Sequence, residues 1–220
     1  MNHLSLAPDR TSRAWYSDSI AEFIDSAPDR ILGRLAANSD FAVLPEQRDA
    51  WLIQIRLLQA HLPGLSGWLF MEFNIPRMGR RIDTVLLIGP AVFVVEFKVG
   101  DAEFKRAAVD QVWDYALDLK NFHSASHAAP IAPILIATCA EASPPVSPHI
   151  DQDQVFRPIS ICPSDIRGTF NVVLQSLSGT WLDEHWGAAP YRPTPTIIEA
   201  ARALYAQHSV EAIARYDAGA

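Results

Sequence analysis

Apolar residues in the first part of the chain recur with the period of a helix. Within residues 45–62, four of them follow one another at steps of four, three and four positions. They are Trp51, Ile55, Leu58 and Leu62. Such steps place all four side chains on one face of an α-helix, and the following Pro63 and Gly64 are expected to end it.

The pattern changes to that of β-strands from residue 67 onward. Three short runs rich in Val, Ile, Leu and Phe are separated by Arg-Met-Gly and Gly-Pro, which are turn sequences. We therefore predict an antiparallel meander of three strands, formed by residues 67–75, 81–88 and 91–98. A later run at residues 131–138 is apolar at nearly every position, which predicts a buried central strand.

The remaining segments complete an α/β pattern. We predict further helices at residues 15–27, 28–37, 103–122 and 165–177, the last capped by Ser164, and a fifth strand at 155–161. The order of these elements predicts the fold class, an α/β core with a mixed central sheet flanked by helices. We expect a helical N-terminal extension (1–44), this core (45–190) and a helical tail (191–220).

The composition suits a packed soluble protein. Of the 220 residues, 49% are hydrophobic and 20% are charged, and no apolar run approaches the roughly 20 residues that span a bilayer. No signal peptide is evident after the polar segment 1–12, and Cys139 and Cys162 form neither a disulfide framework nor a zinc site. We therefore expect a cytoplasmic protein with no membrane partner. The net charge of −7 argues against binding nucleic acid by bulk attraction but allows local contacts to phosphates.

Three of the charged residues in the predicted meander are expected to come together. Asp83 lies in an otherwise apolar strand, and Glu96 and Lys98 lie at the end of the next strand. Side chains alternate along a strand, so Glu96 and Lys98 share a face and lie about 7 Å apart. The tight turn between the strands places Asp83, near the start of one, beside Glu96, near the end of the other. We therefore expect all three groups at one end of the hairpin.

This grouping favours a site for a divalent cation. Two adjacent carboxylates repel each other, and Mg²⁺ or Mn²⁺ relieves the repulsion through oxygen ligands. Such an ion lowers the pKa of a bound water, and Lys98 can orient that water or stabilise developing negative charge. The backbone carbonyl of Phe97 is predicted to point toward the ion. Glu96 and Lys98 alone also fit a structural salt bridge, whereas an unpaired Asp83 in a buried strand would cost several kcal/mol.

Further polar residues can surround this site. Gln111 and Tyr115, on the helix predicted at 103–122, are four positions apart and share a face that can reach it, although an ordinary amphipathic boundary has the same spacing. Four cations are candidates for binding nucleic-acid phosphates, namely Arg77, Arg80, Arg81 and Lys105. Solubility or bracing of Asp83 explains the three arginines equally well, and simple solvation suits the lysine better.

The pattern of these residues resembles the motifs of the PD-(D/E)XK nuclease superfamily, in particular its RecB-like and Cas4-like branch with the Gln-x-x-x-Tyr motif. The pattern consists of Asp83, the tripeptide Glu96-Phe97-Lys98 and the pair Gln111 and Tyr115. Ile82 stands in place of the Pro in the family name, which is a frequent departure. The resemblance implies a restriction-endonuclease-like core. It also implies metal-dependent hydrolysis of phosphodiester bonds in DNA, less often RNA.

The same resemblance implies roles for particular residues. Asp83 and Glu96 would be metal ligands, and Lys98 would be the catalytic lysine. Members of the superfamily often add an acidic residue from the helix before the meander. Glu46 is the candidate by position, and Glu72, on the first strand of the meander, competes with it.

Residues 95–100, 110–123 and 191–201 resemble the N-terminal region of large bacterial proteins that carry a C-terminal P-loop DNA/RNA helicase-like domain. This implies an ATPase domain as a partner and a role in DNA processing or in defence against foreign DNA, such as that of phages. No P-loop motif occurs here, so we expect Ala220 to be a fragment boundary. A catalytically inactive module that binds nucleic acid or docks a protein is the alternative, and a homo-oligomer stays open.

Overall fold

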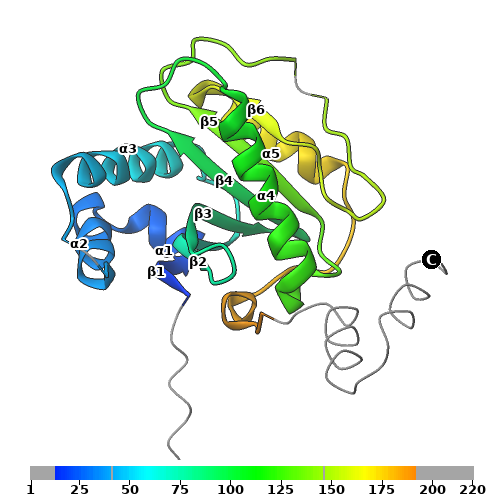
Figure 1. Cartoon of the computed structure of the whole chain (residues 1–220), viewed down its shortest axis with the longest axis horizontal. Helices are drawn as coiled ribbons and strands as arrows, with labels where there is room; N and C mark the ends of the chain where they lie inside the picture. Colours follow the sequence, from blue (N-terminus) through cyan, green and yellow to red (C-terminus); the bar gives the residue numbers. More distant parts are fainter. Residues whose placement is uncertain (1–12, 41, 146, 192–220) are drawn as a thin grey trace, which may run out of the picture.

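A computed structural model describes residues 13–40, 42–145 and 147–191, which form one six-stranded sheet with helices on both faces (Figure 1). The strand order is β1-β2-β3-β4-β5-β6, so every strand lies beside its neighbours in the sequence. The sheet is mixed, which confirms the α/β class predicted from the apolar pattern.

The two halves of the sheet differ in direction because they are connected differently. β1 (Ala14–Ser19), β2 (Gly67–Ile75), β3 (Arg80–Ile88) and β4 (Ala91–Lys98) pair antiparallel. β5 (Ile131–Ala137) and β6 (Ile159–Ile161) continue the sheet parallel to β4. Tight turns join β2 to β3 and β3 to β4, whereas α4 (Arg106–Phe122) crosses over between β4 and β5. The predicted meander is therefore confirmed.

An apolar core lies on each face of the sheet. One face is covered by α1 (Ile20–Asp25), α2 (Pro28–Asn38), α3 (Pro45–His61) and α5 (Ile166–Gln175). The other is covered by α4 and a 3₁₀ helix at Glu184–Ala188. Shorter 3₁₀ helices lie at Ser124–Ser126 and Pro163–Asp165. β5 has neighbours on both sides and both faces, and all its residues are buried, as the apolar run predicted.

The segment before α1 is a strand, where the sequence predicted a helix over residues 15–27. Ala14 and Tyr16 are buried and alternate with less buried neighbours, and the segment pairs with β2 as an edge strand. α1 begins only at Ile20, where the Ser19 side chain accepts a hydrogen bond from the Glu22 N–H at 3.1 Å. The prediction was wrong because six residues are too few to distinguish the period of a strand from that of a helix. The segment is a strand because it pairs with β2, which lies about 50 positions further along the sequence. The N-terminal extension thus contributes a strand to the sheet as well as helices.

Most other boundaries agree with the predictions to within three residues. β6 is the largest departure, because only its last three residues are a strand and Val155 forms an isolated bridge with Ile131. α5 follows a 3₁₀ turn, so Asp165, not Ser164, is its N-cap residue. No helix in the described segments is both long and apolar enough to cross a bilayer. The tail predicted at 191–220 lies, after Tyr191, outside the described residues.

Gly67, the first residue of β2, is a position that admits no side chain. Its φ is 147°, and a Cβ at this position would lie 1.8 Å from the Leu87 carbonyl oxygen. We expect Gly67→Ala to lower the free energy of unfolding by about 3 kcal/mol or more, because β2 or β3 would have to move. Urea unfolding followed by circular dichroism measures this loss.

Gly79 provides the matched control for this steric explanation. Its φ is 60°, but no atom lies within 4 Å of the position that a Cβ would occupy. Gly79→Ala should therefore lose only about 1 kcal/mol from the left-handed backbone. Equal losses for the two variants would show that the close approach to Leu87 is not the cause.

Candidate active site

β3 and β4 separate where Asp83 and Glu96 come together. The last residue pair between the two strands is Thr84 with Val95, so Asp83 and Glu96 are the next residues along and are unpaired. The backbone N–H of Phe97, which no longer bonds to β3, donates to Asp83 Oδ2 at 2.8 Å. β4 stays paired with β5 beyond this point, so the opening lies only on the side of β3. The structure thus places both carboxylates at one end of the hairpin.

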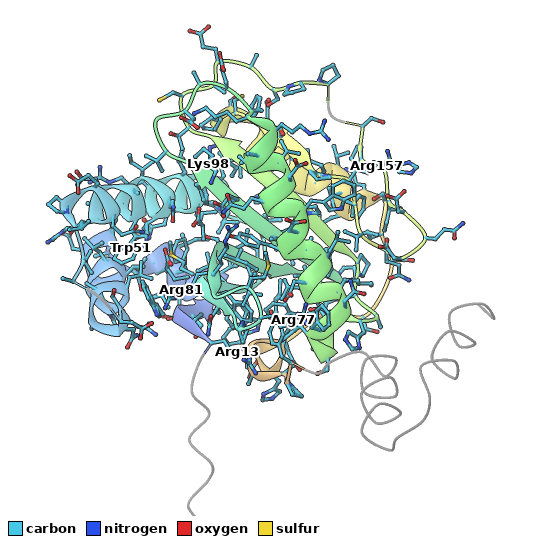
Figure 2. All side chains as sticks on the ribbon, in the orientation of Figure 1. Arg13, Trp51, Arg77, Arg81, Lys98 and Arg157 are labelled. Atoms are coloured by element: carbon cyan, nitrogen blue, oxygen red, sulfur yellow. The ribbon has the colours of Figure 1, made fainter. Side chains whose placement is uncertain are left out.

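A connected set of hydrogen bonds joins β4 to α4. Lys98 Nζ donates to Glu96 Oε1 at 2.8 Å and to Gln111 Oε1 at 3.1 Å. Gln111 Nε2 lies 2.8 Å from Glu96 Oε1 and also 2.8 Å from the Tyr115 hydroxyl. Lys98 lies at the end of β4, beside α4 (Figure 2). The strand alternation and the helical spacing therefore bring all four predicted side chains together.

Glu72 of β2 is a third carboxylate at this place. The residues on either side of it pair with the residues on either side of Asp83, so the two acids face each other across β2 and β3. Glu72 Oε1 accepts a hydrogen bond from Trp51 Nε1 of α3 at 2.7 Å. Both side chains of this bond are buried. Three adjacent strands thus each contribute one acidic residue: Glu72, Asp83 and Glu96.

Burial raises the pKa of all three carboxyl groups. For half-buried Asp83, loss of hydration is the largest cause, the charges of Glu96 and Glu72 add to it, and the pKa lies well above its usual value. Loss of hydration also raises the pKa of Glu96, against the hydrogen bond from Lys98, and that of Glu72. Burial lowers the pKa of Lys98, but the hydrogen bond and charge of Glu96 outweigh it, and the net shift is upward. The lysine therefore stays charged. Its charge offsets only part of the effect that loss of hydration has on the pKa of Glu96.

The oxygen atoms of the site suit a hard divalent cation. Glu96 Oε2 is buried without a hydrogen-bond partner among the described residues. In a strand, the N–H and C=O of one residue point to the same side, so the Phe97 carbonyl faces the gap in which its N–H meets Asp83. Carboxylate and carbonyl oxygens are the ligands that Mg²⁺ and Mn²⁺ prefer. Within the described segments, no group of three or more His, Cys, Asp or Glu side chains could hold a metal ion as the side chains stand.

Three of the four cations predicted to bind nucleic acid are paired with acidic residues. The pairs are Arg77 with Asp118 (3.3 Å), Arg81 with Asp40, and Lys105 with Asp101 (2.9 Å). The two arginines also stack on aromatic rings, Arg77 on Phe122 and Arg81 on Trp15. They extend to different parts of the molecule (Figure 2), so they do not form one cationic cluster. Bracing and solvation account for these three cations.

Arg80 differs from the other three cations. It is exposed, and no ion pair in the described part of the chain involves it. Its positive charge opposes the rise in the pKa of Glu96 and of Tyr115, so it lies within electrostatic reach of the site. Of the four candidate cations, Arg80 is therefore the one whose charge no ion pair of the described residues engages.

The helix acid expected from the family resemblance makes no direct bond to this cluster among the described residues. Glu46 is exposed in the first turn of α3, and no hydrogen bond or ion pair of the described residues joins it to Asp83 or Glu96. Glu72, the competing candidate, lies opposite Asp83 in the register of β2 and β3. Trp51 was predicted only as an apolar residue of α3, and its polar role was missed. A buried indole N–H needs an acceptor, and this requirement is the signal that could have linked it to an acid in a buried strand.

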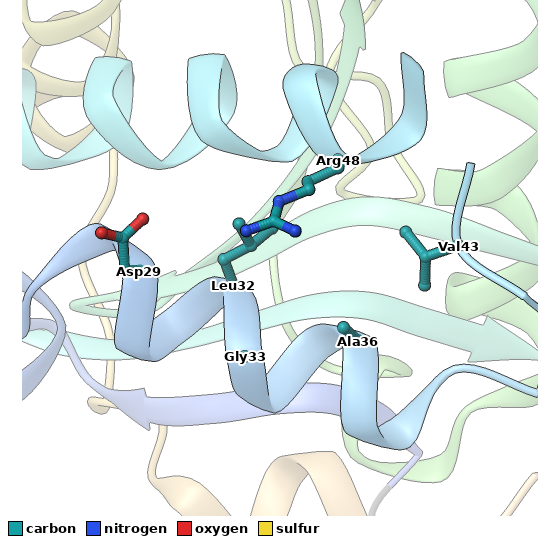
Figure 3. A pocket seen from close by; sticks show the side chains of 6 residues that line it. All are labelled: Asp29, Leu32, Gly33, Ala36, Val43 and Arg48. Atoms are coloured by element: carbon teal, nitrogen blue, oxygen red, sulfur yellow. The ribbon is translucent and has the colours of Figure 1, made fainter. Parts of the chain in front are cut away.

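A separate pocket lies between α2 and α3, away from these residues (Figure 3). It is lined by Asp29, Leu32, Gly33, Ala36, Val43 and Arg48. The Arg48 side chain extends from α3 toward Leu32 of α2, and both charged residues of the pocket are exposed. The pocket contains none of the predicted site residues and no buried ionisable group, so we assign it no chemistry.

The cluster at the end of β4 thus combines carboxylates, an ammonium group, an amide and a phenol. Comparisons with protein-family models, with curated proteins and with solved structures found no match for this chain. A function is therefore inferred from these residues, their spacing and their geometry.

Proposed function

We propose that this chain is a divalent-metal-dependent deoxyribonuclease domain that hydrolyses phosphodiester bonds with Mg²⁺ or Mn²⁺ as cofactor. The observation that supports it most is the meeting of Asp83, Glu96 and Lys98 where β3 and β4 separate. A structural salt bridge requires only Glu96 and Lys98. It explains neither the unpartnered Oε2 of Glu96 nor the desolvated carboxyl of Asp83 beside it. A cation site formed by Asp83 and Glu96, with Lys98 beside it, explains both the unpartnered oxygen and the desolvated carboxyl.

The residues of β3 and β4 have distinct roles in this proposal. Asp83, Glu96 and the Phe97 carbonyl would hold the ion, which when bound supplies a water of lowered pKa and positive charge for a phosphate oxygen. Lys98 stays protonated beside Glu96, so it can donate to the attacking water or to an oxygen of the phosphodiester. Donation to the oxygen of the leaving group would stabilise the negative charge that develops on it as its bond to phosphorus breaks.

The residues of α4 and the first residue of β3 would support these groups. Gln111 donates to Glu96 and accepts from Lys98, so it fixes both side chains. Tyr115 in turn contacts Gln111, and such outer contacts orient the groups that act directly. Arg80, which has no ion pair in the described segments, would contact a phosphate of the substrate next to the one that is cleaved.

DNA is the proposed substrate, with RNA second, because the family resemblance implies DNA more often. The resemblance to helicase-linked bacterial proteins supports a place within a larger helicase–nuclease protein for DNA processing or defence against foreign DNA. The small number of cysteines favours the cytoplasm as its compartment. The net charge of −7 fits an enzyme that binds phosphates through a few local groups. Part of the sequence that carries the helicase-linked resemblance, residues 192–201, lies outside the described residues.

Incubation of the protein with single-stranded DNA, double-stranded DNA and RNA tests this function. We expect cleavage with Mg²⁺ or Mn²⁺ and none with excess EDTA. Calorimetric titration with MnCl₂ should show heat of binding, because Glu96 Oε2 is buried without a partner in the described part of the chain. Glu96→Gln should abolish both cleavage and heat, since it removes one of the two carboxylate ligands.

Asp101 provides the control, because its carboxylate belongs to an exposed ion pair with Lys105. Asp101→Asn should retain both the cleavage and the heat of Mn²⁺ binding. Cleavage that persists unchanged in Glu96→Gln would identify a contaminating nuclease. A wild-type protein that gives neither signal would support the alternative, an inactive module of this fold that binds nucleic acid or docks a protein.

A further inference from the structure

The backbone of Glu72 departs from the regular conformation of a strand. Its φ is 53°, in the left-handed region that residues with a Cβ avoid, and among the described non-glycine residues only Gln154 shares a positive φ. The alternation of side chains in β2 breaks here. Met71 packs in the core beneath α3, and Phe73, two positions later, packs in the core beneath α4. In a regular strand both would lie on one face.

β3 has a matching irregularity at Asp83. Ile82 and Val85 are three positions apart, yet both pack in the core beneath α4, where a regular strand would place them on opposite faces. Because both strands break at facing positions, their pairing register is the same before and after the break. The irregularity is therefore confined to Glu72 and Asp83, the two acidic residues of these strands.

Helix α3 fixes the side chain of Glu72. The bond from Trp51 Nε1 to Glu72 Oε1 is 2.7 Å long, and Trp51 is fully buried. The ring of Trp15 packs edge-on against Trp51 at 5.9 Å, which restricts the indole. No hydrogen bond among the described residues uses Glu72 Oε2. One carboxylate oxygen is thus held while the other stays available.

An independent feature of the same place is a buried carboxylate oxygen that has no hydrogen-bond partner among the described residues. Glu96 is only 4% exposed, and its Oε2 has no partner among the described residues, while its Oε1 is occupied by Lys98 and Gln111. Glu72 and Asp83 occupy facing positions of β2 and β3, and the charge of Glu96 contributes to the raised pKa of both carboxyl groups. A buried oxygen without a partner beside two further acids is a place for a cation.

We propose that Glu72 is a third carboxylate of the cation site and that Trp51 is the positioning residue that holds it there. This inference rests on the proposed function. Strand β2 then supplies the acid that the family resemblance assigned to the preceding helix, and the helix supplies only the indole that orients it. The left-handed backbone at Glu72 is explained as the conformation that presents its carboxylate to Asp83.

Calorimetric titration of the full chain with MnCl₂ tests this assignment. Glu72→Gln keeps an oxygen for the Trp51 N–H but removes the charge, and we expect its Mn²⁺ affinity to fall about 10-fold or more. Trp51→Phe keeps an aromatic ring but removes the N–H, and we expect a loss of about 10-fold. Glu46→Gln, the matched control on the first turn of α3, should bind Mn²⁺ as the wild type does.

A double variant separates positioning from general destabilisation. If Trp51 acts through Glu72, then Trp51→Phe should cause no further loss of Mn²⁺ affinity in the Glu72→Gln protein. An additional loss of about 10-fold in the double variant would overturn the positioning role. If Glu72→Gln does not fold, an unchanged affinity of Trp51→Phe overturns the proposal by itself.

The failure of this inference is distinguishable from failure of the proposed function. Wild-type affinity in Glu72→Gln, together with lost heat in Asp83→Asn, would exclude Glu72 as a ligand and leave the nuclease proposal intact. Weakened binding in Glu46→Gln alone would assign the third acid to α3 instead. No heat of Mn²⁺ binding in the wild type would overturn both.

Discussion

Replacement of Asp83 by Asn is expected to reduce the rate of DNA cleavage by about 1,000-fold or more. The amide keeps the size of the side chain and an oxygen for the Phe97 N–H, but it removes the negative charge that would bind the ion. A metal ion contributes several kcal/mol to the stabilisation of transition-state charge, and about 1.4 kcal/mol corresponds to a factor of ten in rate. Single-turnover cleavage of DNA with saturating Mn²⁺ gives the ratio of the two rates.

The same substitution is expected to stabilise the protein at neutral pH when metal is removed. Desolvation and the charges of Glu96 and Glu72 raise the pKa of Asp83 in the folded state. The folded protein therefore binds this proton more tightly than the unfolded chain does. The free energy of unfolding should fall as the pH rises from about 4, the pKa of an exposed Asp, through the raised value of the folded state. Asn carries no charge, so this decline should be smaller in the variant.

Urea unfolding in EDTA at several pH values above about 4 measures this difference. Asp101→Asn is the control, because Asp101 forms an exposed pair with Lys105, and this variant should show neither the gain in stability nor the loss of cleavage. An Asp83→Asn protein that unfolds more easily than the wild type at neutral pH would contradict the expected cost of the buried charge. Cleavage at the wild-type rate would contradict the role of Asp83 as a ligand.

The part of the site that follows from local periodicity could be predicted from the sequence. Glu96 and Lys98 share a face because strand side chains alternate, and Gln111 and Tyr115 share a face because they are one helical turn apart. The hydrogen bonds that join these pairs agree with both spacings. Asp83 needed only the pairing of two strands across a tight turn. The positions of these side chains depend on residues close in the sequence, so the spacing of the residues is enough to predict which side chains meet.

The parts that depend on distant residues or on an irregular backbone could not be predicted. Glu72 and Trp51 are 21 positions apart, and the left-handed φ of Glu72 follows from no local pattern. Arg77 and Arg81 each pair with an acid 41 positions away, so the sequence could not tell that they are already engaged. The strand β1 was mistaken for a helix for the same reason, because its partner β2 lies far along the chain.

Replacement of Lys98 by Met is expected to separate catalysis from cation binding. Met keeps most of the apolar stem but removes the ammonium group, which lies 2.8 Å from Glu96 Oε1 and 3.1 Å from Gln111 Oε1. The remaining carboxylates cannot donate a hydrogen bond to the attacking water or to the phosphate. Loss of one donor that stabilises transition-state charge costs about 100- to 1,000-fold in rate, and we expect cleavage to fall by this factor.

Mn²⁺ affinity in the Lys98→Met protein should stay the same or increase, because the lysine and the ion compete for the charge of Glu96. Without metal, the variant should be less stable than the wild type, since a buried carboxylate has lost its counter-charge. Lys105→Met, in an exposed pair, is the control and should change neither property. A loss of Mn²⁺ binding as complete as that of Asp83→Asn would mean that Lys98 only maintains the folded site, and its role in the chemistry would have to be abandoned.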